Sequence, residues 1–102
     1  MFGLKDFQIE SIQQCFANFP KIEQVIVYGS RAKGNFKTGS DIDLTILADE
    51  FDYSELLKLE NQLDDLLLPY KIDLSLKKHI DNPDLIAHIE RVGLVFYNRA
   101  LR

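Results

Sequence analysis

Length, composition and charge indicate one soluble domain. The chain has 102 residues, of which 46% are hydrophobic and 27% charged, and its 12 Lys and Arg against 16 Asp and Glu give a net charge of −4. A chain of this length supports one hydrophobic core, so we expect a single domain over residues 1–102. The acidic balance argues against direct nucleic-acid binding, because binding by phosphate neutralisation needs clustered Lys and Arg.

Hydrophobic runs and cysteine content exclude further classes. No apolar run approaches the ~20 residues of a membrane-spanning helix, and the first ten residues, MFGLKDFQIE, lack the features of a signal peptide. We therefore expect a cytoplasmic protein that binds no membrane. The lone Cys15 excludes an intramolecular disulfide and is interpreted as a core residue. His79 and His88 are too few for a zinc site, and their positions indicate no role.

Hydrophobic periodicity predicts seven main elements. Apolar residues at spacings of three and four before Pro20 are typical of one face of an amphipathic helix. Runs rich in β-branched residues predict strands, and Pro and Gly mark the ends of the helices. In chain order we expect a helix over 5–19, strands over 22–28 and 41–48, a helix over 54–67, a strand over 71–76, a helix over 83–92 and a strand over 94–97. This order, without repeats or linkers, indicates a single α/β or α+β sheet domain.

Two predicted strands carry acidic residues on one face. Asp41 and Asp43 are two positions apart, and alternate side chains of a strand point to the same face. Asp73 has the corresponding position in the next strand along the chain. If these two strands are neighbours in the sheet, the three carboxylates converge.

Converging carboxylates raise one another's pKa and are commonly neutralised by a divalent cation. Hard oxygen ligands favour Mg²⁺ or Mn²⁺ over zinc. Such a triad can hold two ions, one activating an attacking oxygen and the other stabilising a leaving phosphate, which is the chemistry of phosphoryl or nucleotidyl transfer. The alternative for an Asp-x-Asp pair is two strand-end residues that face water, and the third Asp weakens that alternative.

A glycine–serine turn follows the first predicted strand. Gly29 and Ser30 begin a short predicted helix, a setting in which backbone N–H groups bind anions and glycine lets a phosphate approach the backbone. The alternative is an ordinary strand-to-helix turn. The segment has Gly34 at P-loop spacing, but Asn35 and Phe36 stand where a P-loop needs Lys and Ser or Thr. No G-x-G-x-x-G is present, so a Rossmann dinucleotide site has no support.

The spacing of these motifs resembles the signature of the DNA polymerase β-like nucleotidyltransferase superfamily, in which a Gly-Ser pair is followed after ten residues by Asp-x-Asp. The sequences GSRAKG and GSDIDL are most similar to the minimal nucleotidyltransferase (MNT) family, small prokaryotic proteins encoded beside a helical partner of the HEPN family. The resemblance covers most of the chain. It implies the nucleotidyltransferase fold, a small mixed sheet of about four strands with helices packed mainly on one face.

The resemblance implies a role for each motif residue. Asp41 and Asp43 would be ligands of two Mg²⁺ ions, with Mn²⁺ as a substitute. Asp73 would be the third metal-binding carboxylate and the candidate base. Gly29 and Ser30 would hold the triphosphate of ATP. ATP itself is inferred from the family alone, because no side chain in the sequence indicates an adenine site.

Two cationic side chains lie in the same segment as the glycine–serine turn. Arg31 and Lys33 are close enough in sequence to contact phosphate, so both are candidate ATP ligands. The alternative is that they are solvated loop cations.

The family resemblance implies transfer of AMP from ATP to another protein. The chain carries no helical domain of the kind that holds the acceptor in larger superfamily members, so we expect a partner protein to be the acceptor or to present it. The family points to a tyrosine hydroxyl on a HEPN partner in a hetero-oligomer, which would silence a toxin RNase and make this chain an antitoxin. Two alternatives stay open: a binding subunit without catalysis, and a small-molecule transferase whose partner supplies the acceptor site.

The hydrophobic residues near the end of the sequence allow two interpretations. Phe96, Tyr97 and Leu101 either complete the sheet and core, which we favour, or form a surface for a partner.

Overall fold

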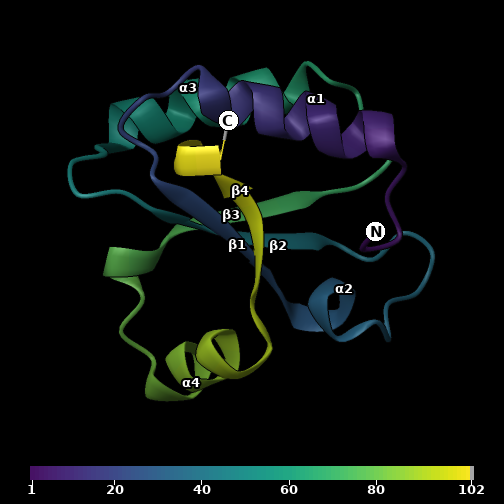
Figure 1. Ribbon diagram of the computed structural model, residues 1–102. Helices are drawn as coiled ribbons and strands as arrows, with labels where there is room; N and C mark the ends of the chain where they lie inside the picture. The colour runs from purple at the N-terminus through teal and green to yellow at the C-terminus, as the bar shows by residue number, and fades with distance from the viewer. Residues whose placement is uncertain (102) are drawn as a thin grey trace.

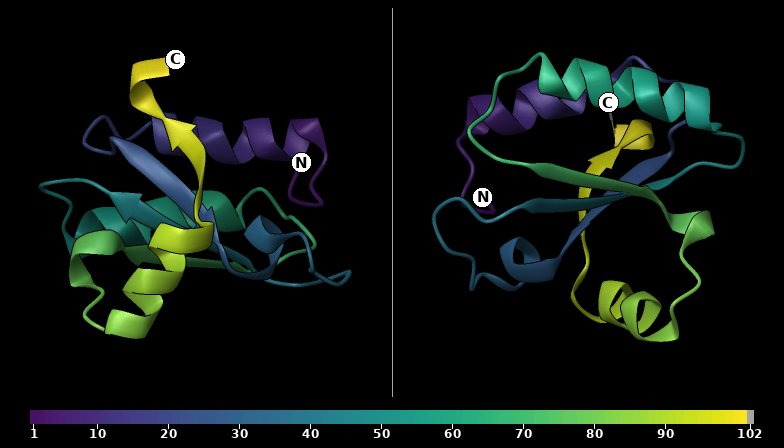
Figure 2. Two further views of the ribbon diagram at one scale, coloured as in Figure 1. Left: turned by 60° about the horizontal axis from the view of Figure 1, so that its bottom comes forward. Right: turned by 180° about the vertical axis from the view of Figure 1, so that it is seen from behind.

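The computed structural model describes residues 1–101 and contains a four-stranded sheet with helices on both sides (Figure 1). The elements in chain order are α1 (Asp6–Ala17), β1 (Gln24–Tyr28), α2 (Gly29–Lys33), β2 (Ile42–Leu47), α3 (Tyr53–Asp64), β3 (Ile72–Leu76), the 3₁₀ turn η1 (Lys77–His79), α4 (Pro83–Val92), β4 (Leu94–Asn98) and the 3₁₀ turn η2 (Arg99–Leu101). The two longest helices, α1 and α3, lie together along one face, and the shorter α2 and α4 lie on the other side (Figures 1 and 2).

The sheet is mixed, as expected. Its strand order is β3-β2-β1-β4, with β1 antiparallel to both neighbours and β2 parallel to β3. A parallel pair requires a crossover connection, which here contains α3. This topology places three motif-bearing strand ends next to one another: the last residue of β1 and the first residues of β2 and β3.

The core lies between the sheet and the pair α1 and α3. Alternate residues of β2 are fully or almost fully buried towards this pair: Ile42, Leu44 and Ile46. The intervening side chains of the strand point to the other face, because successive residues alternate. The period-two pattern of the sequence therefore separates a core face from a face that carries polar residues.

The first helix and the last strand meet in this core. Phe16 of α1 is fully buried, and its ring centroid lies 6.4 Å from that of Phe96 and 5.8 Å from that of Tyr97. Phe96 and Tyr97 are themselves buried, so their interpretation as core residues is confirmed. The side chain of Leu101 lies outside the described part of the chain. Cys15 is also buried, as expected, and burial raises the pKa of its thiol.

Several elements are shorter than the sequence predicts. The first helix ends at Ala17, because the chain then turns through hydrogen bonds from Asn18 and Phe19 to carbonyls of the last helical turn. Phe19 still packs in the core, so its side chain extends the helical pattern beyond the helix. Likewise α3 ends at Asp64, and Leu67 follows with a φ of 53°.

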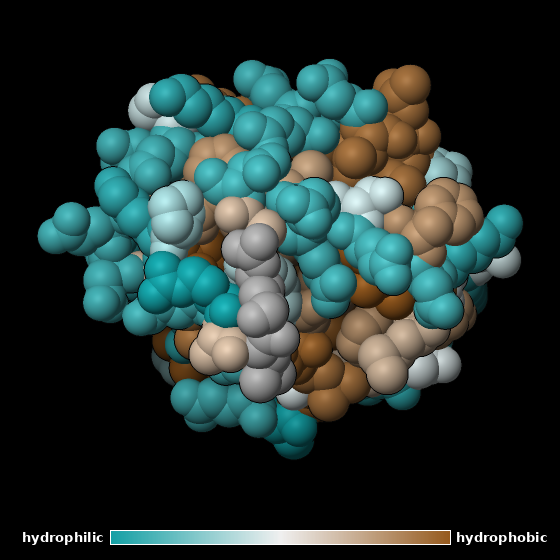
Figure 3. Space-filling view, turned by 45° about the horizontal axis from the view of Figure 1, so that its top comes forward, coloured by the Kyte–Doolittle hydropathy of each residue, from teal (hydrophilic) through white to brown (hydrophobic). Residues whose placement is uncertain are grey.

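The outer surface over α1 and α3 is mostly hydrophilic with scattered hydrophobic patches (Figure 3). The large apolar side chains that are exposed are spread over helices, a strand and connecting segments: Met1, Phe7, Tyr53, Leu57, Leu67, Leu94 and Val95. Within residues 1–101, no helix has both the length and the hydrophobicity that crossing a membrane requires.

Candidate active site

Three neighbouring strands place polar side chains side by side on the face opposite α1 and α3. Tyr28 of β1 pairs with Asp43 of β2, and Asp43 pairs with Asp73 of β3. Residues that are directly opposite each other on adjacent strands point to the same face. The two acids therefore lie next to each other, although 30 positions separate them in the sequence.

Asp41 has a different setting from the one its spacing suggests. The sequence predicts it inside a strand, whereas β2 begins at Ile42, whose N–H donates to the carbonyl of Lys71. Asp41 is the exposed residue just before the strand, so the alternation of the strand does not fix its direction. Its charge nevertheless acts on Asp43 and raises the pKa of that carboxyl.

Asp43 is the half-buried member of the three acids, while Asp41 and Asp73 are exposed. Burial raises the pKa of Asp43 above its ordinary value, and the negative charges of Asp73 and Asp41 raise it further. His88 and Arg31 act in the opposite direction and do not reverse the shift. Asp43 is therefore a partly desolvated carboxylate that lies beside two further negative charges.

The glycine–serine turn touches this carboxylate directly. Gly29 has a φ of 72°, and a β-carbon built on it would overlap the Oδ2 atom of Asp43. Only glycine combines this backbone conformation with so close an approach. The two motifs therefore meet in the structure. The glycine–serine turn, which the sequence suggests as a phosphate site, lies against Asp43, which the sequence suggests as a metal ligand.

The donor set around Asp43 fits a hard divalent cation. Carboxylate oxygens are the ligands that Mg²⁺ prefers, and a cation would offset the burial and the repulsion that together raise the pKa of Asp43. In residues 1–101 no three His, Cys, Asp or Glu side chains are gathered closely enough to form a ready metal-binding cluster. An ion would therefore draw the exposed Asp41 and Asp73 towards Asp43, which their surface positions permit.

Arg31 has a structural role that the sequence did not indicate. The candidate ATP ligand is only 3% exposed, and its guanidinium donates to the carbonyl of Ser40 from Nε at 3.1 Å and Nη2 at 2.8 Å, and to the carbonyl of Phe2 from Nη1 at 2.9 Å. The same group lies 5.1 Å from the ring centroid of Phe36 and 4.6 Å from that of Tyr70. These contacts anchor the loop that leads to Asp41.

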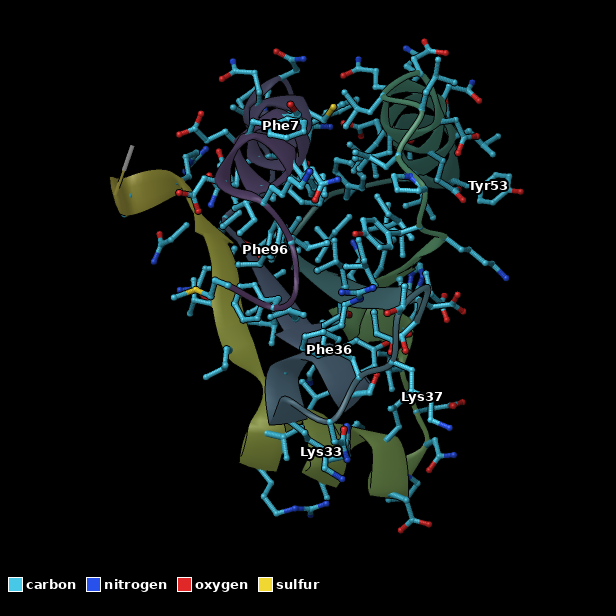
Figure 4. The ribbon with its side chains drawn as sticks, turned by 90° about the vertical axis from the view of Figure 1, so that its right-hand side faces the viewer. Phe7, Lys33, Phe36, Lys37, Tyr53 and Phe96 are labelled. Carbon is cyan, nitrogen blue, oxygen red and sulfur yellow. The ribbon has the colours of Figure 1, made fainter. Side chains whose placement is uncertain are left out.

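The other two residues of the turn segment are accessible. Ser30 is half-buried in the first turn of α2, directly after Gly29, and Lys33 is exposed in the last turn. Figure 4 shows Lys33 in the half of the molecule away from Phe7 of α1. Unlike Arg31, Lys33 keeps its charge at the surface, where a phosphate can reach it.

His88 belongs to the site, although the sequence assigned it no role. Its Nε2 accepts a hydrogen bond from the N–H of Gly29 at 3.2 Å, and its ring meets that of Tyr28 at 80°, with centroids 6.2 Å apart. The only sequence signal was its helical spacing, three residues after Leu85 and next to Ile89, which favours a partly buried position. Its partners lie about sixty positions away, which local patterns cannot reveal.

A family model and curated relatives match most of the sequence. The family described as "Polymerase beta, Nucleotidyltransferase" matches residues 10–101. In Methanocaldococcus jannaschii, the protein named "Putative protein adenylyltransferase MJ1217" is 42% identical over 73 residues, which cover 69% of this chain and 71% of that protein. Another, named "Putative protein adenylyltransferase MJ1379", is 38% identical over 73 residues, covering 69% and 72%.

Solved structures share the fold. A chain in the crystal structure of a toxin–antitoxin with AMP-PNP superposes with a TM-score of 0.69 at 23% identity, covering 96% of this chain and 77% of that one. A chain in the complex of a tri-AMPylated HEPN toxin with MNT antitoxin from Shewanella oneidensis gives 0.67 at 20% identity, covering 96% and 76%. With the family match spanning nearly the whole sequence, this chain belongs to the polymerase beta nucleotidyltransferase family, and its structural neighbours are MNT–HEPN toxin–antitoxin complexes.

Proposed function

We propose that this chain is an MNT-type protein adenylyltransferase that transfers AMP from ATP to a tyrosine hydroxyl of a HEPN-family partner, and so acts in the cytoplasm as the antitoxin of a toxin–antitoxin pair. The names of the relatives from M. jannaschii support protein adenylylation as the activity. The AMPylated HEPN toxin in a neighbouring structure supports the kind of partner.

One observation carries the proposal: the contact between Gly29 and Asp43. Nucleotidyl transfer requires the triphosphate and the metal-binding carboxylates to meet at one phosphorus atom. The glycine is the only residue type that lets the backbone lie against this carboxylate. A turn that served only to connect a strand to a helix would not need that contact.

The three acids would hold the metal. Asp41 and Asp43 would be the ligands of the two Mg²⁺ ions, with Asp73 as the third carboxylate. When bound, the ions supply positive charge to the triphosphate and to the attacking oxygen. The partial burial of Asp43 beside the charges of Asp73 and Asp41 is the feature of this chain that favours them.

Other residues of the chain would bind the triphosphate and accept the proton. Ser30 and Lys33 would donate to the triphosphate, Gly29 would let it approach the backbone, and Asp73 would take the proton of the attacking hydroxyl. The hydroxyl oxygen forms a bond to the α-phosphorus, the bond from that phosphorus to the bridging oxygen of the β-phosphate breaks, and pyrophosphate leaves. Catalysis in this scheme consists of positioning and charge stabilisation.

The accessibility of the acids favours a macromolecular acceptor. Asp41 and Asp73 are exposed, and the pairing of Asp73 with Asp43 places Asp73 on the face of the sheet opposite α1 and α3, the two helices that lie together in Figure 2. A side chain that projects from another protein can reach such a surface without entering a deep pocket.

The test is label transfer from α-labelled ATP with Mg²⁺ to the product of the adjacent gene, which the proposal expects to be a HEPN protein. We expect label on the partner with the unchanged chain and none with Asp41→Asn, which removes a ligand charge. A partner whose tyrosines are changed to phenylalanine should also remain unlabelled, and mass spectrometry of the labelled partner identifies the modified residue.

The alternatives give different results in the same experiment. A stable complex without label, from correctly folded proteins, would contradict the proposal and identify a binding subunit. Label that appears only on an added small molecule, in the presence of the partner, would identify a small-molecule transferase.

A further inference from the structure

The hydrogen bond between His88 and Gly29 connects the last helix to the proposed nucleotide-binding turn. Nε2 of His88 accepts the N–H of Gly29 at 3.2 Å, across 59 positions of the sequence. The imidazole also packs edge-on against Tyr28, the residue that precedes the turn. A single side chain therefore contacts both residues of the peptide that leads into the turn.

Independent contacts hold α4 in place. Asn82 caps its start, where the side-chain oxygen accepts the N–H of Asp84 at 2.9 Å, and Ile89 is buried on the inner side of the helix. Gly93 ends the helix so close to β1 that an added β-carbon would lie 2.7 Å from Cγ2 of Ile26. None of these contacts involves His88, so α4 has a cap and packing contacts of its own besides the imidazole.

The turn itself needs a restraint. Glycine is the residue with the most backbone freedom, and Gly29 adopts a positive φ directly against the carboxylate of Asp43. A hydrogen bond to its N–H fixes the orientation of the Tyr28–Gly29 peptide, and with it the direction in which the backbone of Ser30 leaves the turn.

We propose that His88 is a positioning residue for ATP: it accepts the N–H of Gly29 and so holds the glycine–serine turn in the conformation that receives the triphosphate. The proposal rests on the proposed function, in that the turn is taken as the phosphate-binding element. It adds a residue from the last helix to a site otherwise built from β1, α2, β2 and β3.

Three variants test the role of His88. His88→Leu keeps an apolar side chain in the half-buried space and removes the acceptor, whereas His88→Gln places a carbonyl oxygen where Nε2 accepts. His79→Leu is the matched control, because His79 is exposed in η1 and outside the site. Thermal unfolding of all three establishes that each variant folds.

The first measurement is amide hydrogen exchange of Gly29 in the protein without nucleotide. We expect protection of this amide to fall about tenfold in His88→Leu and to be retained in His88→Gln and His79→Leu. Unchanged protection in His88→Leu would show that the hydrogen bond does not restrain the turn, and would overturn the proposal.

The second measurement is calorimetric binding of AMP-PNP with Mg²⁺. We expect the Kd to rise about tenfold in His88→Leu and to stay within about threefold of the original in His88→Gln. Normal binding by His88→Leu would overturn the role of His88 and leave the proposed function intact. Failure of the unchanged chain to bind the nucleotide would overturn the proposed function and the role of His88 with it.

Discussion

Gly29 and Gly34 share a backbone conformation but not their surroundings. Both have a positive φ, 72° and 84°, yet a β-carbon would overlap Asp43 at Gly29 and would meet nothing within 4 Å at Gly34. We expect Gly34→Ala to lose about 1 kcal/mol of unfolding free energy from backbone strain alone and to retain AMP transfer. Gly29→Ala should lose more than that and should transfer AMP at least about tenfold more slowly, because Asp43 must move.

Chemical unfolding and label transfer measure the two glycine variants side by side. Equal loss of stability in both, with activity kept in Gly29→Ala, would contradict the importance of the contact with Asp43.

The raised pKa of Asp43 has a consequence for the stability of the fold. Its pKa is higher in the folded protein than in the unfolded chain, so the ionised carboxylate destabilises the metal-free fold at neutral pH. As the pH falls through the folded-state pKa, the folded protein takes up the proton first and this penalty disappears. We therefore expect Asp43→Asn to be more stable than the unchanged protein at pH 7, by at most about 1 kcal/mol because solvent screens the site, and to lose AMP transfer.

Thermal unfolding without metal, at pH 7 and near pH 4, tests this prediction. The advantage of Asp43→Asn should shrink as the pH falls. If Asp43→Asn is less stable than the unchanged protein at pH 7, the ionised carboxylate of Asp43 does not destabilise the metal-free fold, and the prediction is wrong.

At the scale of elements, Arg31 shows how a helix of only five residues is fixed to its surroundings. Its guanidinium joins α2 to the carbonyls of Phe2 and Ser40, and therefore to the segments that precede α1 and β2. Arg31→Lys keeps the charge but cannot reproduce the planar fork, so we expect a loss of about 2 kcal/mol of unfolding free energy. Arg91→Lys, at an exposed position of α4, should change it by less than about 0.5 kcal/mol.

Urea unfolding measures both arginine variants. A loss in Arg31→Lys no larger than in Arg91→Lys would show that the buried hydrogen bonds do not stabilise the fold.

The kinds and order of the main elements were predictable because each carries a local pattern. The helix over 83–92 was correct to the residue, since Pro83 and Gly93 mark its ends chemically. The first helix was predicted too long because Phe19 continues the apolar spacing through a turn. Boundaries without a Pro or Gly signal depend on which carbonyl accepts the next N–H, and the pattern of side chains does not contain that information.

At the scale of the whole molecule, the packing of the first helix against the last strand closes the fold. Phe16 of α1 is fully buried against Phe96 and Tyr97 of β4, whereas Phe7 on the same helix is 61% exposed. We expect Phe16→Ala to lose about 3–5 kcal/mol of unfolding free energy, a large share of what a domain of this size has, and Phe7→Ala to change it by less than about 0.5 kcal/mol.

Guanidinium unfolding of both variants gives the comparison. Similar unfolding midpoints for Phe16→Ala and Phe7→Ala would show that the packing of α1 against β4 contributes little to stability.

The residues of the candidate site differ in how far the sequence reveals them. The sequence predicts that Asp73 converges with Asp43 only if their two strands are neighbours, and the pairing of β2 with β3 meets that condition. The roles of His88 and Arg31 depend on contacts between segments that are distant in the sequence, or on burial that only the folded chain defines. Motif spacing identified the candidate acids and the glycine–serine turn, whereas the contacts of His88 and Arg31 exist only in the folded chain.

The two faces of the parallel pair β2–β3 have a consequence for how this protein tolerates mutation. Even-numbered residues, such as Ile42, Leu44 and Leu76, face the core, and the odd-numbered Asp43 and Asp73 face the site. In a mutational scan, substitutions at even positions should deplete variants from a selection for cellular abundance. Substitutions at the two odd-numbered acids should pass that selection and fail one for activity, so the two selections should separate neighbouring residues of one strand.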